Sequence, residues 1–297
     1  MEDTAAREKE RETKQILRQV QEHFFHAHQS LGAVRESVGM VDVLHHPTNP
    51  TGMLNYVTPR KNTAWVSRSM IEPGLEHLRK LSRTPRVQYI EGLFPPMFAK
   101  ELRKLDLKVE REMPMMVYKP GGINGHVPPE VKLPEAPDGV SIQHATDQRS
   151  IELWWYVWRN AHYDVLTLGV EPLFVGRDMA ALKSGQQIDI LAYRHGFPVG
   201  VARVSIHEQT GHILALALMK EARTPGMTRL LQTAAMQAAL ERNCELVFAP
   251  GETDEDRKLC REMGFMDFGS IVCYAAGSDS GREDSNDSYL DQSVLTL

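Results

Sequence analysis

The stretch "PGGINGHVPPEVKLPEAPDG" at residues 120–139 constrains the fold more than any other feature of the chain. Proline lacks a backbone N–H and fixes φ, and glycine has no side chain to pack, so neither a helix nor a strand interior tolerates this density of both. The stretch splits the 297 residues into two parts, each of ordinary domain size. We expect domains at 1–120 and 140–276, a linker at 121–139, and a polar, acidic, disordered tail at 277–297.

The first part alternates helical and extended patterns, which indicates an α/β unit. The turn-rich "HHPTNPTG" contains His45 and His46, which are adjacent and therefore lack the spacing of metal ligands, so we expect a plain loop and no metal. The expected elements are a charged amphipathic helix at 5–28, a strand at 53–57, a helix at 67–83 broken near Pro73, a strand at 86–92, a helix at 94–107 and a strand at 110–120.

The second part has a different order, with three strands in a row joined by the short turns "HGFP" and "EQTG". Such turns predict an antiparallel meander. The expected elements are a strand at 140–146, helices from Asp147 and at 171–185, strands at 186–195, 198–208 and 212–219, a helix, a strand at 245–250, a helix at 254–264 and a strand at 265–276.

Composition excludes several classes of protein. A net charge of −5 argues against a nucleic-acid-binding surface, and no apolar run is long enough to span a bilayer. The charged start "MEDTAAREKERETK" is no signal peptide. The cysteines, Cys244, Cys260 and Cys273, are odd in number and lack zinc spacing, so we expect reduced thiols in a cytoplasmic protein without a membrane or nucleic-acid partner.

A strand changes into a helix at "EARTPGMTRLLQ", and this junction is suited to bind an anion. A helix N-terminus presents unpaired N–H groups and a partial positive charge. Gly226 lets the backbone approach an anion closely, Pro225 suits the first helical turn, and Arg223 can add a charge-assisted contact. The pattern is consistent with a diphosphate cradle, and also with a proline-glycine turn before an ordinary core helix.

The order of elements from residue 140 to 276 resembles the GNAT superfamily of acyl-CoA-dependent N-acyltransferases. Arg223, Gly226 and Thr228 occupy the three positions of the family's Gln/Arg-x-x-Gly-x-Gly/Ala cradle, with Thr228 departing from the usual small residue. "KLCREMGF" resembles the family's closing helix and its Gly-Phe turn. The first part resembles a shorter copy without a cradle, in which "IEPG" at residues 71–74 lacks the basic residue.

The resemblance implies an α/β (α+β) protein of two tandem GNAT-like folds, with mixed, mostly antiparallel sheets flanked by helices. It implies acetyl-CoA as co-substrate, with the pantetheine arm along residues 214–219. The residues implied to bind the co-substrate are Leu216, Leu218, Arg223, Thr224, Pro225, Gly226, Met227, Thr228 and Arg229.

The resemblance also suggests candidates for proton transfer. Cys260 stands where the family often has a tyrosine that acts as the general acid, and Thr253 stands where an asparagine is common. For the base, His212 and Glu221 lie at the two ends of the cradle-side strand. Plainer interpretations exist: Cys260 packs as a small hydrophobe, and His212 is a solvated turn residue. The reaction then uses water as the base and needs no dedicated side chain.

The aromatic run "WWYVWRNAHY" borders the acceptor side in this family, which makes Tyr156, Trp158 and His162 candidates for lining a pocket, although such residues are mostly core. The expected function is transfer of an acetyl group to the amine of a small molecule or peptide by a monomer or homodimer. One alternative is a catalytically inactive GNAT-fold protein that binds CoA or a partner. Another is an aminoacyl transferase of the paired-GNAT type.

Overall fold

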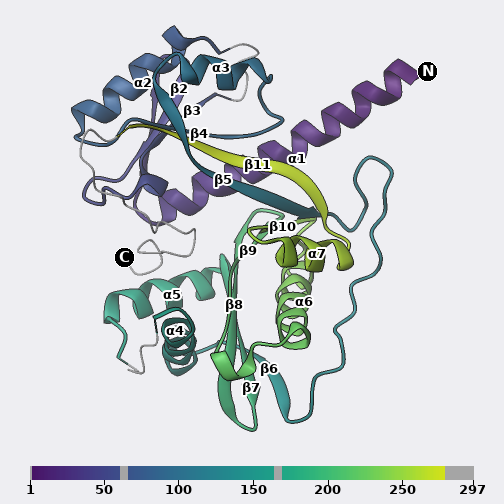
Figure 1. Ribbon diagram of the computed structural model, residues 1–297. Helices are drawn as coiled ribbons and strands as arrows, with labels where there is room; N and C mark the ends of the chain where they lie inside the picture. The colour runs from purple at the N-terminus through teal and green to yellow at the C-terminus, as the bar shows by residue number, and fades with distance from the viewer. Residues whose placement is uncertain (1, 61–65, 164–168, 278–297) are drawn as a thin grey trace. The chain divides into compact units, whose positions relative to one another are not determined.

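The computed structural model describes residues 2–60, 66–163 and 169–277, which form two compact units (Figure 1). Unit 1 comprises residues 1–115 and 268–297, and unit 2 comprises residues 116–267. Strand β11 (Met266–Ala276) therefore contributes its residues from Phe268 on to unit 1, whereas the expected second domain ran to 276. The domain division stays a prediction, and the expected disordered tail lies outside the described residues apart from Gly277.

Unit 1 holds a mixed sheet in the strand order β1-β2-β3-β4-β11-β5. The pairs β1–β2, β2–β3 and β4–β11 are antiparallel, and the pair β3–β4 is parallel. Its other strands are β1 (Val34–Val38), β2 (Val41–His45), β3 (Tyr56–Pro59), β4 (Arg86–Ile90) and β5 (Leu107–Tyr118), whose last residues belong to unit 2. Its helices are α1 (Glu2–Ser30), α2 (Arg68–Lys80) and α3 (Met97–Arg103), with a 3₁₀ turn at Gly52–Leu54.

Helices α1 and α2 cover opposite faces of the unit 1 sheet. Phe25 of α1 packs with Leu44 and Tyr56, whereas α2 packs on Val43 and Val57. Neighbouring residues of a strand point to opposite faces, so β2 and β3 each contribute core residues to the packing of both helices.

Three features of unit 1 correct the sequence-based expectations. The β1–β2 hairpin was missed, and it makes His45 a strand residue rather than part of a loop. A 3₁₀ turn replaces the start of the expected strand at 53–57. Helix α2 continues through Pro73 without a break. Gly74 supports the continuous helix, because a Cβ there would lie only 2.7 Å from a methyl group of Val41, so only glycine allows α2 to pack this closely on the sheet.

Unit 2 is built on strands in the order β10-β9-β8-β7-β6, antiparallel except for β9 and β10. The predicted meander of three strands is confirmed. The strands are β6 (Val140–His144), β7 (Gln187–Arg194), β8 (Phe197–His207), β9 (Thr210–Leu218) and β10 (Leu246–Pro250). The helices are α4 (Gln148–Tyr163), α5 (Pro172–Ser184), α6 (Pro225–Glu241) and α7 (Asp254–Glu262), with a 3₁₀ turn at Lys220–Ala222.

The helices of unit 2 form two layers around its sheet: α4 and α5 lie on one side and α6 on the other (Figure 1). Trp154, Trp155 and Trp158 of α4 are fully buried, which confirms the core interpretation for the tryptophans of the aromatic run, whereas Tyr156 and His162 are not fully buried. The proline-rich stretch contains neither helix nor strand, and Gln237 of α6 donates a hydrogen bond to the Val131 carbonyl within it. None of the helices in the described ranges combines the length and apolarity needed to cross a membrane.

Candidate active site

Strands β9 and β10 separate partway along their length. They pair in parallel over only three residues, ending at His212 opposite Phe248. Strand β9 then continues to Leu218 and β10 to Pro250. On its other side β9 carries a β-bulge at Leu214, because Arg203 of β8 pairs with Ala215 while Val204 pairs with Ile213. A bulge bends and twists a strand, which explains why β9 leaves β10 at this point.

The opened end of β9 leads directly to the N-terminus of α6. Thr224 caps this helix, because its hydroxyl accepts a hydrogen bond of 3.2 Å from the Met227 N–H. Pro225 follows in the first turn, and a Cβ on Gly226 would meet no atom within 4 Å among the described residues outside its own turn of helix. The helix terminus is therefore open at Gly226, as the cradle interpretation requires.

Arg223 has a role that the sequence did not reveal. Its Nε donates to the Leu218 carbonyl at 3.0 Å, and a terminal nitrogen donates to the Ala161 carbonyl at 2.7 Å. The guanidinium thus links the end of β9 to the last turn of α4, and that contact fixes the loop before the cradle. Beside it, burial and then the charge of Arg223 lower the pKa of His162, whose ring lies 4.2 Å from that of Trp158.

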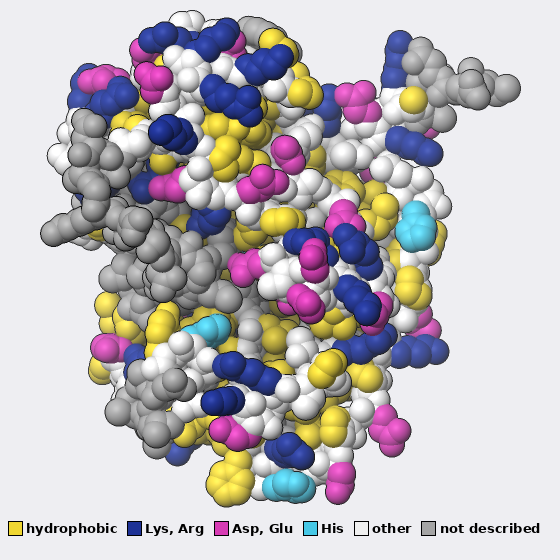
Figure 2. Space-filling model, viewed as in Figure 1, with side chains coloured by type: hydrophobic (Ala, Val, Ile, Leu, Met, Phe, Trp, Pro, Cys, Tyr) yellow, Lys and Arg dark blue, Asp and Glu magenta, His cyan; other side chains and the backbone are white. Residues whose placement is uncertain are grey.

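The remaining cradle residues are exposed or engaged within the protein. The N–H and hydroxyl of Thr228 both donate to the Thr224 carbonyl, at 3.0 and 3.2 Å. Arg229 forms an exposed ion pair of 3.2 Å with Glu262 of α7. Around α7, acidic and basic side chains are interspersed on the surface (Figure 2). Leu216 is partly buried, and Leu218 is buried with the core of unit 2.

His212 lies at the last paired position before the strands separate. The side chain is 2% exposed, and its ring stacks on Phe248 with the centroids 4.2 Å apart and the planes 7° from parallel. The expectation that His212 might be a solvated turn residue is therefore wrong. The stacked rings of His212 and Phe248 therefore join β9 to β10 at the position where their pairing ends.

Cys260 is completely buried in the core of unit 2. Gln232 of α6 donates a hydrogen bond of 3.1 Å to its sulfur. Burial is the main cause that raises the pKa of this thiol to about 11. The contacts favour the packing interpretation of Cys260, and Thr253 is likewise used structurally, because it forms the capping box of α7 with Asp256. Glu221 is exposed in the 3₁₀ turn before the cradle.

A buried charge cluster in unit 2 was missed by the sequence analysis. Arg203 of β8 is 1% exposed and bonds Asp189 at 2.7 and 2.8 Å and Asp178 of α5 at 2.6 Å. Burial alone would lower the pKa of Arg203, but Asp189 and Asp178 raise it. The guanidinium also lies 4.0 Å from the ring centroid of Trp154, and the Trp155 N–H donates to Asp178. The cluster is sealed from solvent, and it fastens α4 and α5 to the sheet.

Comparison with known proteins agrees with this architecture. Residues 152–265 match the acetyltransferase (GNAT) family model. A search of curated proteins found no significant match. A GCN5-related N-acetyltransferase from Kribbella flavida has a similar structure, with a TM-score of 0.63, 16% identity, and coverage of 84% of this chain and 92% of the other.

Two further structures resemble the chain over both units. A tandem GNAT protein from the clavulanic acid biosynthesis pathway has a TM-score of 0.59 and 14% identity, with 84% and 85% coverage. A GCN5-related N-acetyltransferase from Sphaerobacter thermophilus has a TM-score of 0.54 and 14% identity, with 80% coverage of each chain. Residues 152–265 thus match the acetyltransferase (GNAT) family, and the fold of the chain is the tandem GNAT arrangement of mixed, mostly antiparallel sheets.

Proposed function

We propose that this protein is an N-acyltransferase that moves an acetyl group from acetyl-CoA to the amine of a small-molecule or peptide acceptor in the cytoplasm. The observation that carries the proposal is the separation of β9 from β10 at a bulge, directly before an open helix N-terminus. An extended arm fits along a strand edge that has lost its partner, and a diphosphate fits a helix terminus.

Each part of acetyl-CoA has a proposed binding element. The backbone of β9 from Leu214 to Leu218 binds the pantetheine arm, whose amides need hydrogen-bond partners. The α6 terminus from Thr224 to Arg229 binds the diphosphate. Gly226 is the critical residue, because the space beside it is open and any side chain would enter it.

The reaction is a direct transfer. The amine nitrogen attacks the thioester carbonyl carbon, the new C–N bond forms, and the C–S bond breaks. The amine loses one proton and the departing thiolate gains one, so no redox partner is needed. Of the three proposed proton carriers, Glu221 is exposed, whereas His212 and Cys260 are buried. Solvent water is sufficient to exchange both protons.

A matched pair of glycine variants tests the proposal. Gly226→Asp places a carboxylate where the diphosphate would bind, yet an acidic residue at a helix N-terminus is favourable for folding. Gly176→Asp alters an exposed glycine of α5 whose added Cβ would likewise meet no atom of the described residues within 4 Å outside its own turn of helix. CoA release from acetyl-CoA, measured with a panel of primary amines, should fall by at least about 100-fold in the first variant and stay near wild type in the second.

The buried thiol at the tyrosine position favours one alternative, a GNAT-fold protein that binds CoA without catalysis. Acetyl-CoA binding that Gly226→Asp abolishes, together with no CoA release for any amine, would support that alternative. The absence of binding by any acyl-CoA would contradict both.

A further inference from the structure

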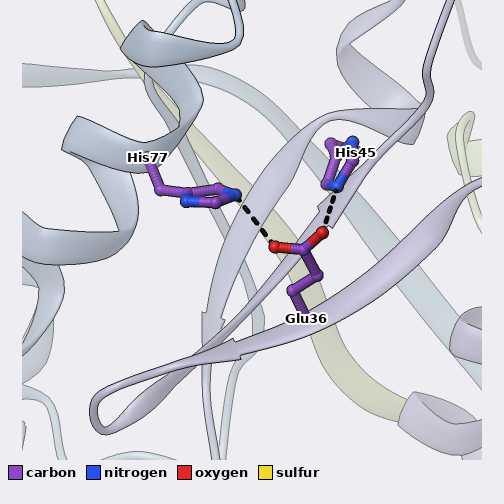
Figure 3. A group of neighbouring side chains, drawn as sticks. All are labelled: Glu36, His45 and His77. Carbon is purple, nitrogen blue, oxygen red and sulfur yellow. Dashed lines mark hydrogen bonds and ion pairs between the residues drawn. The ribbon is translucent and has the colours of Figure 1, made fainter.

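Three potential metal ligands converge in unit 1, far along the chain from the cradle. Glu36 of β1, His45 of β2 and His77 of α2 point toward one another (Figure 3). Nε2 of His45 and Nε2 of His77 each lie 3.1 Å from a different oxygen of the Glu36 carboxylate. One ligand atom from each of the three residues lies within 4.8 Å of the other two.

The fold of unit 1 determines this convergence. In the β1–β2 hairpin Glu36 pairs with Val43 and Val34 pairs with His45, so Glu36 and His45 are diagonal neighbours on one face. That face is the one covered by α2, because Val43 belongs to the core beneath the helix. The close approach at Gly74 brings the next turn, with His77, onto the same spot.

The chemistry of the three side chains suits a transition-metal ion. Two imidazole nitrogens and one carboxylate oxygen form a ligand set used by zinc, with bonds of about 2.0–2.2 Å. Tetrahedral geometry with such bonds separates neighbouring ligand atoms by roughly 3.3 Å. The observed 3.1 Å separations are close to this value, so small side-chain rotations would admit an ion.

The surroundings leave the cluster accessible but held in place. The side chains of His45 and His77 are 12% and 29% exposed, and that of Glu36 is 44% exposed. Nε2 of His45 forms a hydrogen bond of 3.1 Å with the carboxylate of Glu36, which holds both side chains in place. His46 is not part of the cluster, because its Nδ1 accepts hydrogen bonds from the backbone of Thr48 and Asn49.

We propose that Glu36, His45 and His77 form a Zn²⁺ site that fastens the β1–β2 hairpin to α2, with water as the fourth ligand. We expected no metal at His45 because the neighbouring histidine in the sequence, His46, is adjacent and lacks the spacing of a second ligand. The site uses ligands from three separate elements instead. In its metal-free form the same carboxylate accepts a hydrogen bond from His45 and forms an ion pair with His77, which keeps the ligands together.

The test titrates Zn²⁺ into untagged, chelator-treated full-length protein against a zinc-binding dye. The wild type should show one saturable site per chain. Glu36→Gln, His45→Asn and His77→Asn should each weaken it by more than the roughly 10–100-fold cost of losing an outer-sphere partner. His144→Asn, which changes an exposed histidine of β6, is the matched control and should stay within about twofold of wild type.

A second measurement keeps the test decisive if a histidine variant folds poorly. Glu36→Gln preserves the shape of the side chain, and Co²⁺ in place of Zn²⁺ should give the visible absorption bands of a tetrahedral site in the wild type but not in this variant. The absence of a saturable site in the wild type would overturn the proposal. So would equal binding by the wild type and all three ligand variants.

Discussion

Cys260 combines complete burial with a position that often carries a catalytic acid in the GNAT superfamily. Because the thiol is enclosed and hydrogen-bonded to Gln232, we expect Cys260→Ser to act on stability rather than on chemistry. The free energy of unfolding should fall by about 1–2 kcal/mol, since a hydroxyl replaces a small apolar group in the core. Turnover and acetyl-CoA affinity should stay within a few-fold of wild type.

A different result is expected for Cys260→Ser if Cys260 is the general acid. Loss of a general acid typically costs about 10²-fold or more in rate. A serine variant with an unchanged melting temperature and that loss of turnover would establish Cys260 as the acid.

His28 predicts how the stability of unit 1 depends on pH. Burial, and to a lesser extent the charge of Arg111, lower the pKa of His28 from 6.5 to about 4. Its neutral ring lies 2.9 Å from the Tyr56 hydroxyl. As pH falls from about 6.5 toward 4, His28 is protonated in the unfolded chain but stays neutral in the folded chain. The free energy of unfolding should therefore fall by up to about 3 kcal/mol. Denaturant unfolding at several pH values measures this.

The contribution of His28 is isolated by comparing two variants. His28→Gln should flatten the pH dependence of unfolding between pH 6.5 and 4, whereas His144→Gln, at an exposed position, should retain it. Equal slopes for both variants would show that other groups cause the acid sensitivity.

Single residues were predictable from sequence where local chemistry sufficed. Thr224, Pro225 and Gly226 form a capped helix start, as their order indicated. Asp189 and Arg203 each interrupt an apolar strand, and they pair directly opposite each other in β7 and β8. A single charge in each of two apolar strands was the sequence signal for this buried ion pair. The Glu36 cluster had no comparable signal, because its third ligand, His77, comes from a separate helix.

At the scale of elements, the Arg203 cluster holds two helices against one face of the unit 2 sheet. Arg203→Met should leave Asp189 and Asp178 buried without their cation and cost about 3–5 kcal/mol of unfolding free energy. Arg229→Met breaks an exposed pair with Glu262 and should cost less than about 1 kcal/mol. Chemical denaturation of both variants provides the comparison. Similar small losses would mean that the cluster contributes little.

Most elements followed from local patterns, and the misses have physical causes. The three-strand meander was predictable from apolar alternation and short turns. The β1–β2 hairpin was not, because its β1 strand, "VRESV", is polar at its three central positions and has no buried residue. Helix α2 appeared broken because proline and glycine usually end helices, whereas here Gly74 is required by the packing on Val41 and Val57.

At the scale of the whole molecule, β11 makes unit 1 depend on residues near the end of the chain. Val272 lies in the unit 1 core and pairs with Tyr89 of β4. Val272→Asp should therefore lower the free energy of unfolding by at least about 2 kcal/mol and speed hydrogen exchange in β4. Gln143→Asp, on exposed β6, should change neither. Unchanged exchange in β4 would contradict the assignment of β11 to unit 1.

The membership of β11 illustrates the limit of sequence-based domain prediction. The proline-rich stretch begins only a few residues after the unit boundary at residue 115, because linkers have a compositional signature. The return of residues 268–276 to unit 1 is a long-range strand pairing, for which neither turn nor spacing in the sequence gives a signal.

The most direct test of the proposed acyl-CoA site is hydrogen exchange of the full-length protein with and without acetyl-CoA. We expect slower exchange in peptides covering residues 213–218 and 224–229, where β9 leaves β10 and α6 begins, and no such effect in Gly226→Asp. Protection confined to other segments, or none at saturating acetyl-CoA, would contradict the central claim that the opening beside β9 and the α6 terminus form the acyl-CoA site.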